Sequence, residues 1–192
     1  MRMFERDQET LPAWLLERLE HGGRAFSTPE NRMREVIEYS RLNVLHGTGG
    51  PFGAAVFDAD SGRLIAGGVN RVVPLSASIA HAEMLAISAA QQQLGSFDLG
   101  AEGLPRCELV TSCEPCAMCF GAIPWSGIKS VVCGAASEDA ERIGFDEGPR
   151  HPDWVGELEA RGIGVVTGLC RSEAARVLAD YQANRGLIYN AR

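Results

Sequence analysis

Apolar residues change their spacing several times along this chain, and each change predicts the boundary of a secondary-structure element. Apolar positions three and four residues apart favour amphipathic helices, whereas short continuous apolar runs between turn residues favour buried strands. Helices are predicted at residues 11–20, 29–46, 82–93, 115–123, 137–142, 153–161 and 171–185. Strands are predicted at residues 52–57, 63–69, 106–112, 128–133 and 163–167.

Boundary residues support several of these elements. Thr28 and Pro29 are typical of the N-cap and the first position of a helix, and Gly22-Gly23 follows the first helical segment. The turn at residues 58–62 joins the first two strands as a hairpin. Residues 71–80 carry few structural signals, and we expect them to form a loop beside an active site.

The order of the elements predicts one α/β domain spanning residues 1–192. After the hairpin, helices alternate with strands, and a helical crossover between strands implies parallel pairing. We therefore expect a three-layer α/β/α sandwich around a mixed five-stranded sheet, with the fifth strand parallel to the fourth. Residues 1–46 supply N-terminal helices, and residues 186–192 form a tail. Ligand sites of such sheets lie beyond the carboxyl ends of the strands.

Composition and charge narrow the class of protein. The 192 residues are 45% hydrophobic, which is enough for one core. The net charge is −7 and Lys129 is the one lysine, which argues against nucleic acid because phosphate binding needs clustered positive charge. No segment approaches the roughly 20 apolar residues of a membrane span. The first ten residues lack the apolar core of a secretion signal, so we expect a cytoplasmic protein whose six cysteines are thiols or metal ligands.

Two short motifs carry the chemistry of the sequence. His81-Ala82-Glu83 precedes Pro115-Cys116-Ala117-Met118-Cys119, and together they match the zinc-deaminase signature H-x-E followed by P-C-x-x-C. Zinc takes tetrahedral nitrogen and sulfur ligands, and catalytic sites leave one position for water. The sequence therefore predicts a zinc-activated water beside a proton carrier.

Each residue type has a distinct role in that prediction. Cys116 and Cys119 share a helix face, and Pro115 at the first helical position places both thiols in the first turn, where the helix dipole favours thiolates. His81 opens the other helix as third ligand. We expect one zinc ion with a bound water or hydroxide, whose proton Glu83 takes and returns to the substrate.

Other interpretations of the cysteines remain. Cys113 and Cys116 also have C-x-x-C spacing, and Cys113 as a fourth ligand would make a closed, structural zinc site. A redox or disulfide pair and a non-enzymatic zinc-stabilised binding module are further alternatives. We favour three ligands, because Cys113 precedes Pro115 and lies outside the predicted helix.

The glycine-rich segment 47–51 suggests a phosphate-binding loop. No Gly-Lys-Ser/Thr follows it and no helix begins there, so we reject that interpretation. The segment leads instead into the first strand.

The sequence resembles the cytidine deaminase-like superfamily of zinc deaminases, and within it the bacterial guanine deaminases. The resemblance runs from about residue 49 to residue 146. It rests on Gly50-Pro51-Phe52-Gly53-Ala54, Asn70, Ala80-His81-Ala82-Glu83, Thr111-Ser112-Cys113-Glu114-Pro115-Cys116, Cys119, Gly121-Ala122-Ile123, Trp125 and Gly144-Phe145-Asp146. The chain departs from shorter family members in its additional N-terminal helix and in residues 148–154.

The resemblance implies a homodimeric enzyme that hydrolyses guanine to xanthine and ammonia in a purine pocket closed by C-terminal segments. It implies that Asn70 hydrogen-bonds the base, that the Ala82 backbone N–H donates to a ring carbonyl, and that Trp125 lines the pocket. An acidic residue after Gly144-Phe145 handles the amine of the substrate. Asp146 and Glu147 are both candidates, and we favour Glu147 as a second catalytic proton carrier because its side chain is longer.

Two aromatic residues and several substrates stay open. Phe52 either stacks on the base or belongs to the core, and Tyr189 either caps the pocket or packs elsewhere. A related aminoheterocycle, such as the s-triazine ammeline, guanosine or cytosine, is an alternative substrate. Adenosine in tRNA is a further alternative, which the acidic charge of the chain disfavours.

Overall fold

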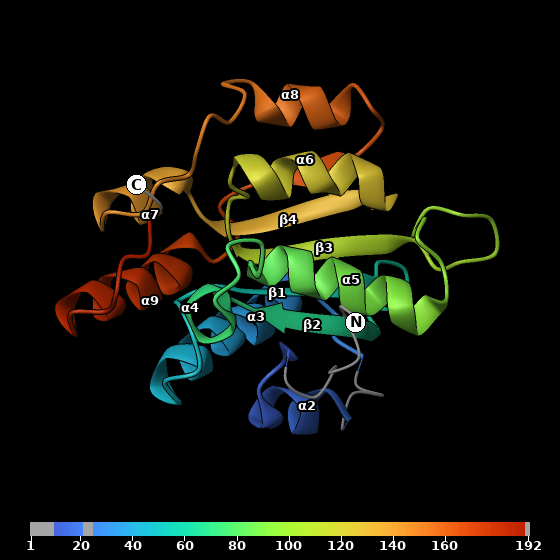
Figure 1. The fold of residues 1–192 in the computed structure, drawn as a ribbon. Helices are drawn as coiled ribbons and strands as arrows, with labels where there is room; N and C mark the ends of the chain where they lie inside the picture. The colour runs from blue at the N-terminus through green and yellow to red at the C-terminus, as the bar shows by residue number, and fades with distance from the viewer. Residues whose placement is uncertain (1–9, 21–24, 191–192) are drawn as a thin grey trace.

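A computed structural model describes residues 10–20 and 25–190 of the protein, and its centre is a five-stranded sheet (Figure 1). The strands are β1 (Gly53–Asp58), β2 (Leu64–Val69), β3 (Cys107–Cys113), β4 (Ser130–Ala135) and β5 (Gly164–Val166). Their order in the sheet is β2-β1-β3-β4-β5. β1 runs antiparallel to both its neighbours, whereas β3, β4 and β5 are mutually parallel. The predicted mixed sheet, with its fifth strand parallel to the fourth, is confirmed.

Helices cover both faces of the sheet (Figure 1). On one face lie α5 (Ala82–Leu94), α6 (Ala117–Ser126) and α8 (Trp154–Glu159), and on the other lie α2 (Ala13–Glu20), α3 (Pro29–Leu45), α7 (Ser137–Arg142) and α9 (Arg171–Ala183). Successive strand residues therefore enter opposite cores: Val56 and Leu109 pack under α5 and α6, and Phe57 and Val110 pack under α3. This arrangement is the predicted three-layer sandwich.

The sequence patterns explain these elements. β1, β2 and β3 are almost continuously buried because helices cover both faces of the sheet, and so their residues do not alternate between apolar and polar. The Thr28 hydroxyl accepts a hydrogen bond from the Asn31 N–H at 3.2 Å, and Pro29 occupies the first helical position of α3, as predicted. The predicted helix end at Gly22-Gly23 lies outside the described residues.

One local prediction was wrong. The expected loop at residues 71–80 contains a one-turn helix, α4 (Val72–Leu75). The Asn70 side chain explains it, because Asn70 Oδ1 accepts the N–H of Val72 at 3.3 Å and so starts a turn.

A buried ion pair fastens α3 to the sheet. Arg32 Nε lies 3.0 Å from Glu108 Oε1, and both side chains are about nine-tenths buried. The Ser130 hydroxyl donates to the other oxygen of Glu108 at 3.1 Å. None of the described helices combines the length and apolar character that crossing a membrane requires.

Candidate active site

The three predicted metal ligands converge at the carboxyl-end edge of the parallel strands. His81 is the N-cap of α5, Cys116 is the N-cap of α6, and Cys119 lies in the first turn of α6. Their ligand atoms all lie within 4.8 Å of one another. Nδ1 of His81 is 3.5 Å from the Cys116 sulfur and 3.6 Å from the Cys119 sulfur. Two residues at the start of α6 and one at the start of α5 thus form a partly buried cluster.

The start of α6 differs from the prediction. Pro115 was expected at the first helical position, but α6 begins at Ala117 and Cys116 is its N-cap, with φ −65° and ψ 173°. This extended backbone at Cys116 places its sulfur against His81, rather than in the helical turn that contains Cys119. Both thiols still lie at the positive end of the helix dipole, but without a metal the expected preference for thiolate holds for Cys116 alone.

The acidity of the thiols fits a soft divalent metal. The hydrogen bond from Cys119, assisted by His81, lowers the pKa of Cys116 to about 4. The same hydrogen bond, together with burial, raises the pKa of Cys119 above its usual value. A cation between the sulfur atoms removes that penalty and allows both thiols to ionise. Two thiolates and an imidazole nitrogen are a zinc donor set with one position left for water.

Cys113 does not join this cluster. Its buried thiol lies 3.6 Å from the carbonyl oxygen of Ala136, to which it donates. Burial raises the pKa of this thiol well above its usual value and so keeps it protonated. Among the described residues, the group able to hold a metal here contains His81, Cys116 and Cys119 alone. The four-ligand alternative is therefore not supported.

A cavity of about 270 Å³ opens above the metal ligands. Its lining includes His81, Cys116, Glu83, Asn70, Phe52 and Tyr189. Glu83 lies in the first turn of α5 and is only 7% exposed. Burial, reinforced by the thiolate of Cys116, raises the pKa of this carboxyl. Glu83 is therefore a carboxyl group that can both take and return a proton next to the metal ligands.

The two acidic candidates after Phe145 differ in their surroundings, although both line the cavity. Asp146 is exposed, and its carboxylate accepts the N–H of Gly148 at 2.9 Å. Glu147 is partly buried, and burial together with Cys116 and Glu83 raises its pKa to about 8. Glu147 is thus the residue of the pair that faces the metal ligands.

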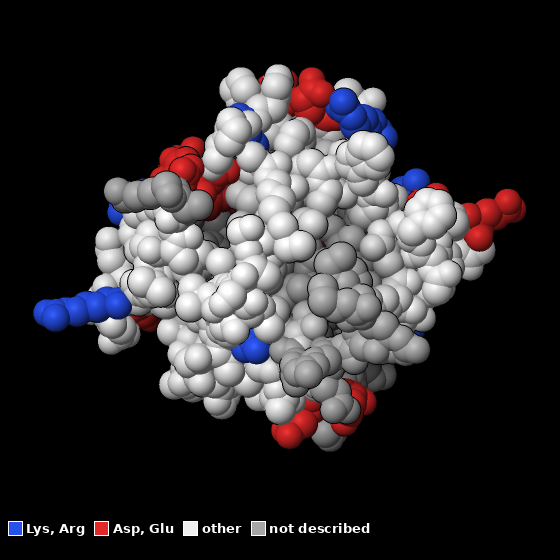
Figure 2. Space-filling model, viewed as in Figure 1, with Lys and Arg blue, Asp and Glu red and all other residues white. Residues whose placement is uncertain are grey.

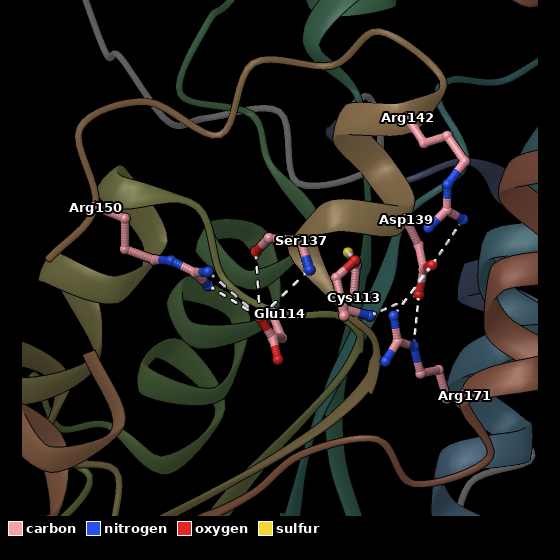
Figure 3. Close-up of polar contacts among 8 residues, drawn as sticks. Cys113, Glu114, Ser137, Asp139, Arg142, Arg150 and Arg171 are labelled. Atoms are coloured by element: carbon pink, nitrogen blue, oxygen red, sulfur yellow. Dashed lines mark hydrogen bonds and ion pairs between the residues drawn. The ribbon is translucent and has the colours of Figure 1, made fainter. Parts of the chain in front are cut away.

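Polar contacts hold the loop that contains Glu147 against the start of α6, and Figure 3 shows those of Glu114 with Arg150 and Ser137. The backbone carbonyl of Glu147 accepts the N–H of Ala117 at 2.9 Å. Arg150 donates to the Pro115 carbonyl at 3.1 Å and pairs with the Glu114 carboxylate at 3.3 Å. Glu114 also accepts from the backbone and the hydroxyl of Ser137, both at 3.3 Å. The loop and the ligand-bearing helix start are therefore fixed to one another.

Aromatic rings and the C-terminal tail close the opposite side of the cavity. The ring centroid of Phe145 lies 5.0 Å from that of Phe52 and 5.0 Å from that of Tyr189. Asn190 bridges the loop, since it accepts from the Asp146 N–H at 3.1 Å and donates to the Gly144 carbonyl at 2.8 Å. The Tyr189 hydroxyl is buried and has no protein partner among the described residues. Residues 189 and 190 thus reach the cavity of their own chain.

Two predicted substrate residues are absent from the cavity lining, Trp125 because it lies elsewhere and Ala82 because its side chain is buried between two lining residues, His81 and Glu83. Trp125 is 88% exposed on α6 and borders a separate shallow hollow with Phe97 and Arg161, so within one chain it does not line the cavity. Helix α6 turns this side chain outward because Ile123, two positions earlier, faces the core. Ala82 is fully buried as the first residue of α5, where a helix leaves its N–H without an intrahelical acceptor.

Sequence reasoning missed several residues of the cavity wall. Asn190, Val72 and Ser78 line it and belong to no motif, although Val72 and Ser78 lie in the segment 71–80 that was expected beside an active site and Asn190 lies in the predicted tail. Phe145 was noted only as part of a family motif, although it is the ring on which Phe52 and Tyr189 meet. A single aromatic residue directly before an acidic pair is a signal in the sequence by which Phe145 could have been predicted as a wall residue.

Comparisons with known proteins agree with this geometry. Residues 27–135 match the family model of the cytidine and deoxycytidylate deaminase zinc-binding region. Guanine deaminase from Bacillus subtilis (strain 168) is 40% identical over 118 residues, which are 62% of this chain and 71% of that protein.

Solved structures extend the likeness to nearly the whole chain. The crystal structure of NE0047 in complex with 2,6-diaminopurine is 57% identical, with a TM-score of 0.89 over 95% of each chain. A structure of guanine deaminase from Nitrosomonas europaea is 56% identical, with a TM-score of 0.87 over 90% of this chain and 94% of that one. The protein therefore belongs to the cytidine and deoxycytidylate deaminase family and is a zinc-dependent hydrolytic deaminase.

Proposed function

We propose that this protein removes the exocyclic amine of guanine by hydrolysis, giving xanthine and ammonia. The observation that carries the proposal is the small cavity, about 270 Å³, which is lined by the metal ligands His81 and Cys116, by Glu83 and by aromatic side chains, with Cys119 buried beside those two ligands. Its size falls just below the usual range for ligand pockets, about 300–1,000 Å³, as suits a flat base without a sugar. The likeness to guanine deaminases from two organisms supports the same substrate.

The metal ligands and Glu83 carry the central steps. His81, Cys116 and Cys119 hold zinc, which when bound acts as a Lewis acid that makes water nucleophilic near neutral pH. Glu83 takes a proton from the attacking water and delivers it to the ring nitrogen next to the carbon under attack. The carbon–nitrogen bond to the amine then breaks, and one water has been consumed for each ammonia released.

Glu147 is proposed as the second proton carrier. Its partly buried side chain faces Cys116 and Glu83, and the network of Glu114 and Arg150 limits the movement of its loop. Glu147 donates a proton to the amine, which then leaves as ammonia, and recovers a proton from the hydroxyl on the attacked carbon as that hydroxyl becomes the new carbonyl. Asp146 is the weaker candidate, because its carboxylate is already engaged by the Gly148 N–H.

The base is proposed to lie between the aromatic wall and the polar groups of the cavity. Asn70 uses its side-chain Oδ1 to accept from Val72, which leaves its NH₂ group free to donate to the base. Phe52 packs on the ring, and the buried Tyr189 hydroxyl supplies one more hydrogen bond. Ala82 contributes its backbone N–H to a ring carbonyl.

We further propose a homodimer that works in the cytoplasm on purine breakdown. Figure 2 shows few charged side chains on the central face of the molecule, over α6 and the visible part of α5. Trp125 on α6 and Ile79, two residues before His81, leave 88% and 60% of their surface exposed, and we place Trp125 in the contact between chains. The six cysteines are free thiols, as a reducing compartment maintains them. Sedimentation equilibrium at micromolar concentration should give the dimer mass, and a monomer with full activity would exclude this part of the proposal.

An ammonia-release screen tests the substrate. The purified, zinc-loaded protein is assayed with guanine, guanosine, ammeline, cytosine, adenine and tRNA at equal concentration. We expect guanine to give the highest kcat/KM and guanosine to be poor, because Tyr189 and Asn190 close the side of the cavity where a sugar would leave it. Higher kcat/KM with any other compound would replace guanine as the substrate.

A further inference from the structure

A buried amide on α3 is hydrogen-bonded to the residue proposed to bind the base. Asn43 is fully buried, and its Nδ2 donates to the carbonyl oxygens of both Gly50 and Asn70 at 2.8 Å. Asn70 also donates its own N–H to the Phe52 carbonyl at 3.0 Å. The backbone carbonyl and N–H of Asn70 are therefore both held by hydrogen bonds, to Asn43 and to Phe52.

The hydrogen bonds continue from Asn43 to the N-terminal helix α2. Thr48 Oγ1 donates to Asn43 Oδ1 at 2.7 Å, and Trp14 Nε1 donates to the same Thr48 oxygen at 3.1 Å. The Trp14 ring stacks on His46, with centroids 5.6 Å apart. Side chains of Trp14, Thr48 and Asn43 thus form one chain that ends at Asn70, and buried networks of this kind hold a single geometry.

The glycine-rich segment 47–50 makes this close contact possible. A Cβ atom on Gly49 would overlap the Asn70 carbonyl oxygen, so no larger residue fits between the segment and Asn70. A second bond crosses the same contact, because Arg71 Nη1 donates to the Thr48 carbonyl at 2.6 Å. The segment 47–50, which was rejected as a phosphate-binding loop, therefore packs its backbone against Asn70 beside the cavity.

We propose that Asn43, held by Thr48 and Trp14, is a positioning residue that sets the direction of the Asn70 side chain. The inference rests on the proposed function, in which Asn70 contacts the base. With the Asn70 carbonyl held by Asn43 and its Oδ1 held by Val72, its NH₂ group has one direction available, toward the cavity. The additional N-terminal helix then serves substrate binding, although α2 supplies no lining residue among those described.

Substitutions of Thr48 test the relay without touching the cavity. Thr48→Val is isosteric and removes the hydroxyl that joins Trp14 to Asn43, whereas Thr48→Ser keeps it. Ser40→Ala is the matched control, because Ser40 lies buried on the same helix and its hydroxyl bonds only Ile37, at 2.7 Å. KM and kcat for guanine, zinc content, and hydrogen–deuterium exchange of the peptide covering residues 68–73 are measured for each variant.

We expect Thr48→Val to raise KM for guanine about 3–10-fold, as the loss of one or two hydrogen bonds predicts, with kcat within twofold and zinc unchanged. Exchange of residues 68–73 should become faster in Thr48→Val, and both Thr48→Ser and Ser40→Ala should behave like the wild type. Faster exchange with unchanged KM would overturn the proposal, as would unchanged exchange. If the wild type releases no ammonia from guanine, the proposed substrate fails, and the exchange result alone then decides whether the relay holds Asn70.

Discussion

Glu83→Gln replaces one oxygen of a buried carboxylate by an amide nitrogen and leaves the size of the side chain unchanged. Glu83 is outside the cluster of metal ligands, so the variant should keep one zinc per chain. At 7% exposure, bulk water has little access to the position and does not replace the lost base. General acid–base groups contribute about 10²–10⁴-fold each, and Glu83 moves a proton twice, so we expect a loss of kcat near the upper limit.

A 10⁴-fold loss corresponds to about 5.4 kcal/mol of transition-state stabilisation, at about 1.36 kcal/mol for each factor of ten. The assay couples ammonia release from guanine to oxidation of a reduced nicotinamide, and zinc is measured by mass spectrometry on the same sample. Burying a charged carboxylate costs more free energy than burying a neutral amide, so the melting temperature should not fall.

Glu141→Gln is the matched control, because Glu141 is an exposed carboxylate on α7 and should retain full activity. A Glu83→Gln protein that holds zinc and keeps activity within tenfold of the wild type would refute the assignment of Glu83 as proton carrier. A variant that loses zinc would instead show that Glu83 helps to hold the metal.

Three further changes test the metal site and the fold. Cys119→Ser should lose zinc and activity, whereas Cys113→Ser should keep one zinc per chain by atomic absorption; zinc loss in both would restore the four-ligand alternative. Arg171 holds the pKa of the Asp139 carboxyl below its usual range, so this carboxylate stabilises the fold above about pH 4 and that contribution is lost as the pH falls further. Urea unfolding should show that Asp139→Asn costs about 1 kcal/mol at pH 7 and progressively less as the pH falls below about 4, and a cost that does not change with pH would contradict this explanation. Glu108→Gln leaves a buried guanidinium without its charge partner and should cost about 3–5 kcal/mol, and a loss below 1 kcal/mol would mean that the pair is not desolvated.

The metal ligands were predictable because their spacing is local. Cys116 and Cys119 are neighbours on one helix start, and a motif of five residues fixes their relation before the rest of the chain folds. His81 and Glu83 are likewise two positions apart at a helix start. The strands before these two helices, β2 and β3, both run antiparallel to β1 and so end at the same edge of the sheet, which brings the two helix starts together.

The walls of the cavity were less predictable, because their residues meet through tertiary packing. Whether Trp125 faces inward depends on the rotation of α6 about its axis, and α6 is apolar on nearly all sides. Two hydrogen bonds join the Asn190 side chain to residues 144 and 146 of a distant loop, and no periodic pattern in the sequence predicts such a contact. The turn at Val72 depends on the side chain of Asn70, for which the sequence had predicted only a contact with the substrate.

The origin of the cavity walls has a consequence for the refolding of this protein. Phe52 stands before β1, Glu83 opens α5, Glu147 follows β4, and Tyr189 returns after α9. Contacts between residues so far apart in the chain form late, because closing a long loop loses conformational entropy before the contact gives any stabilisation. After dilution from denaturant, the helical circular dichroism signal should therefore recover before catalysis does. The delay between the two signals measures the time that the aromatic wall and the tail take to close.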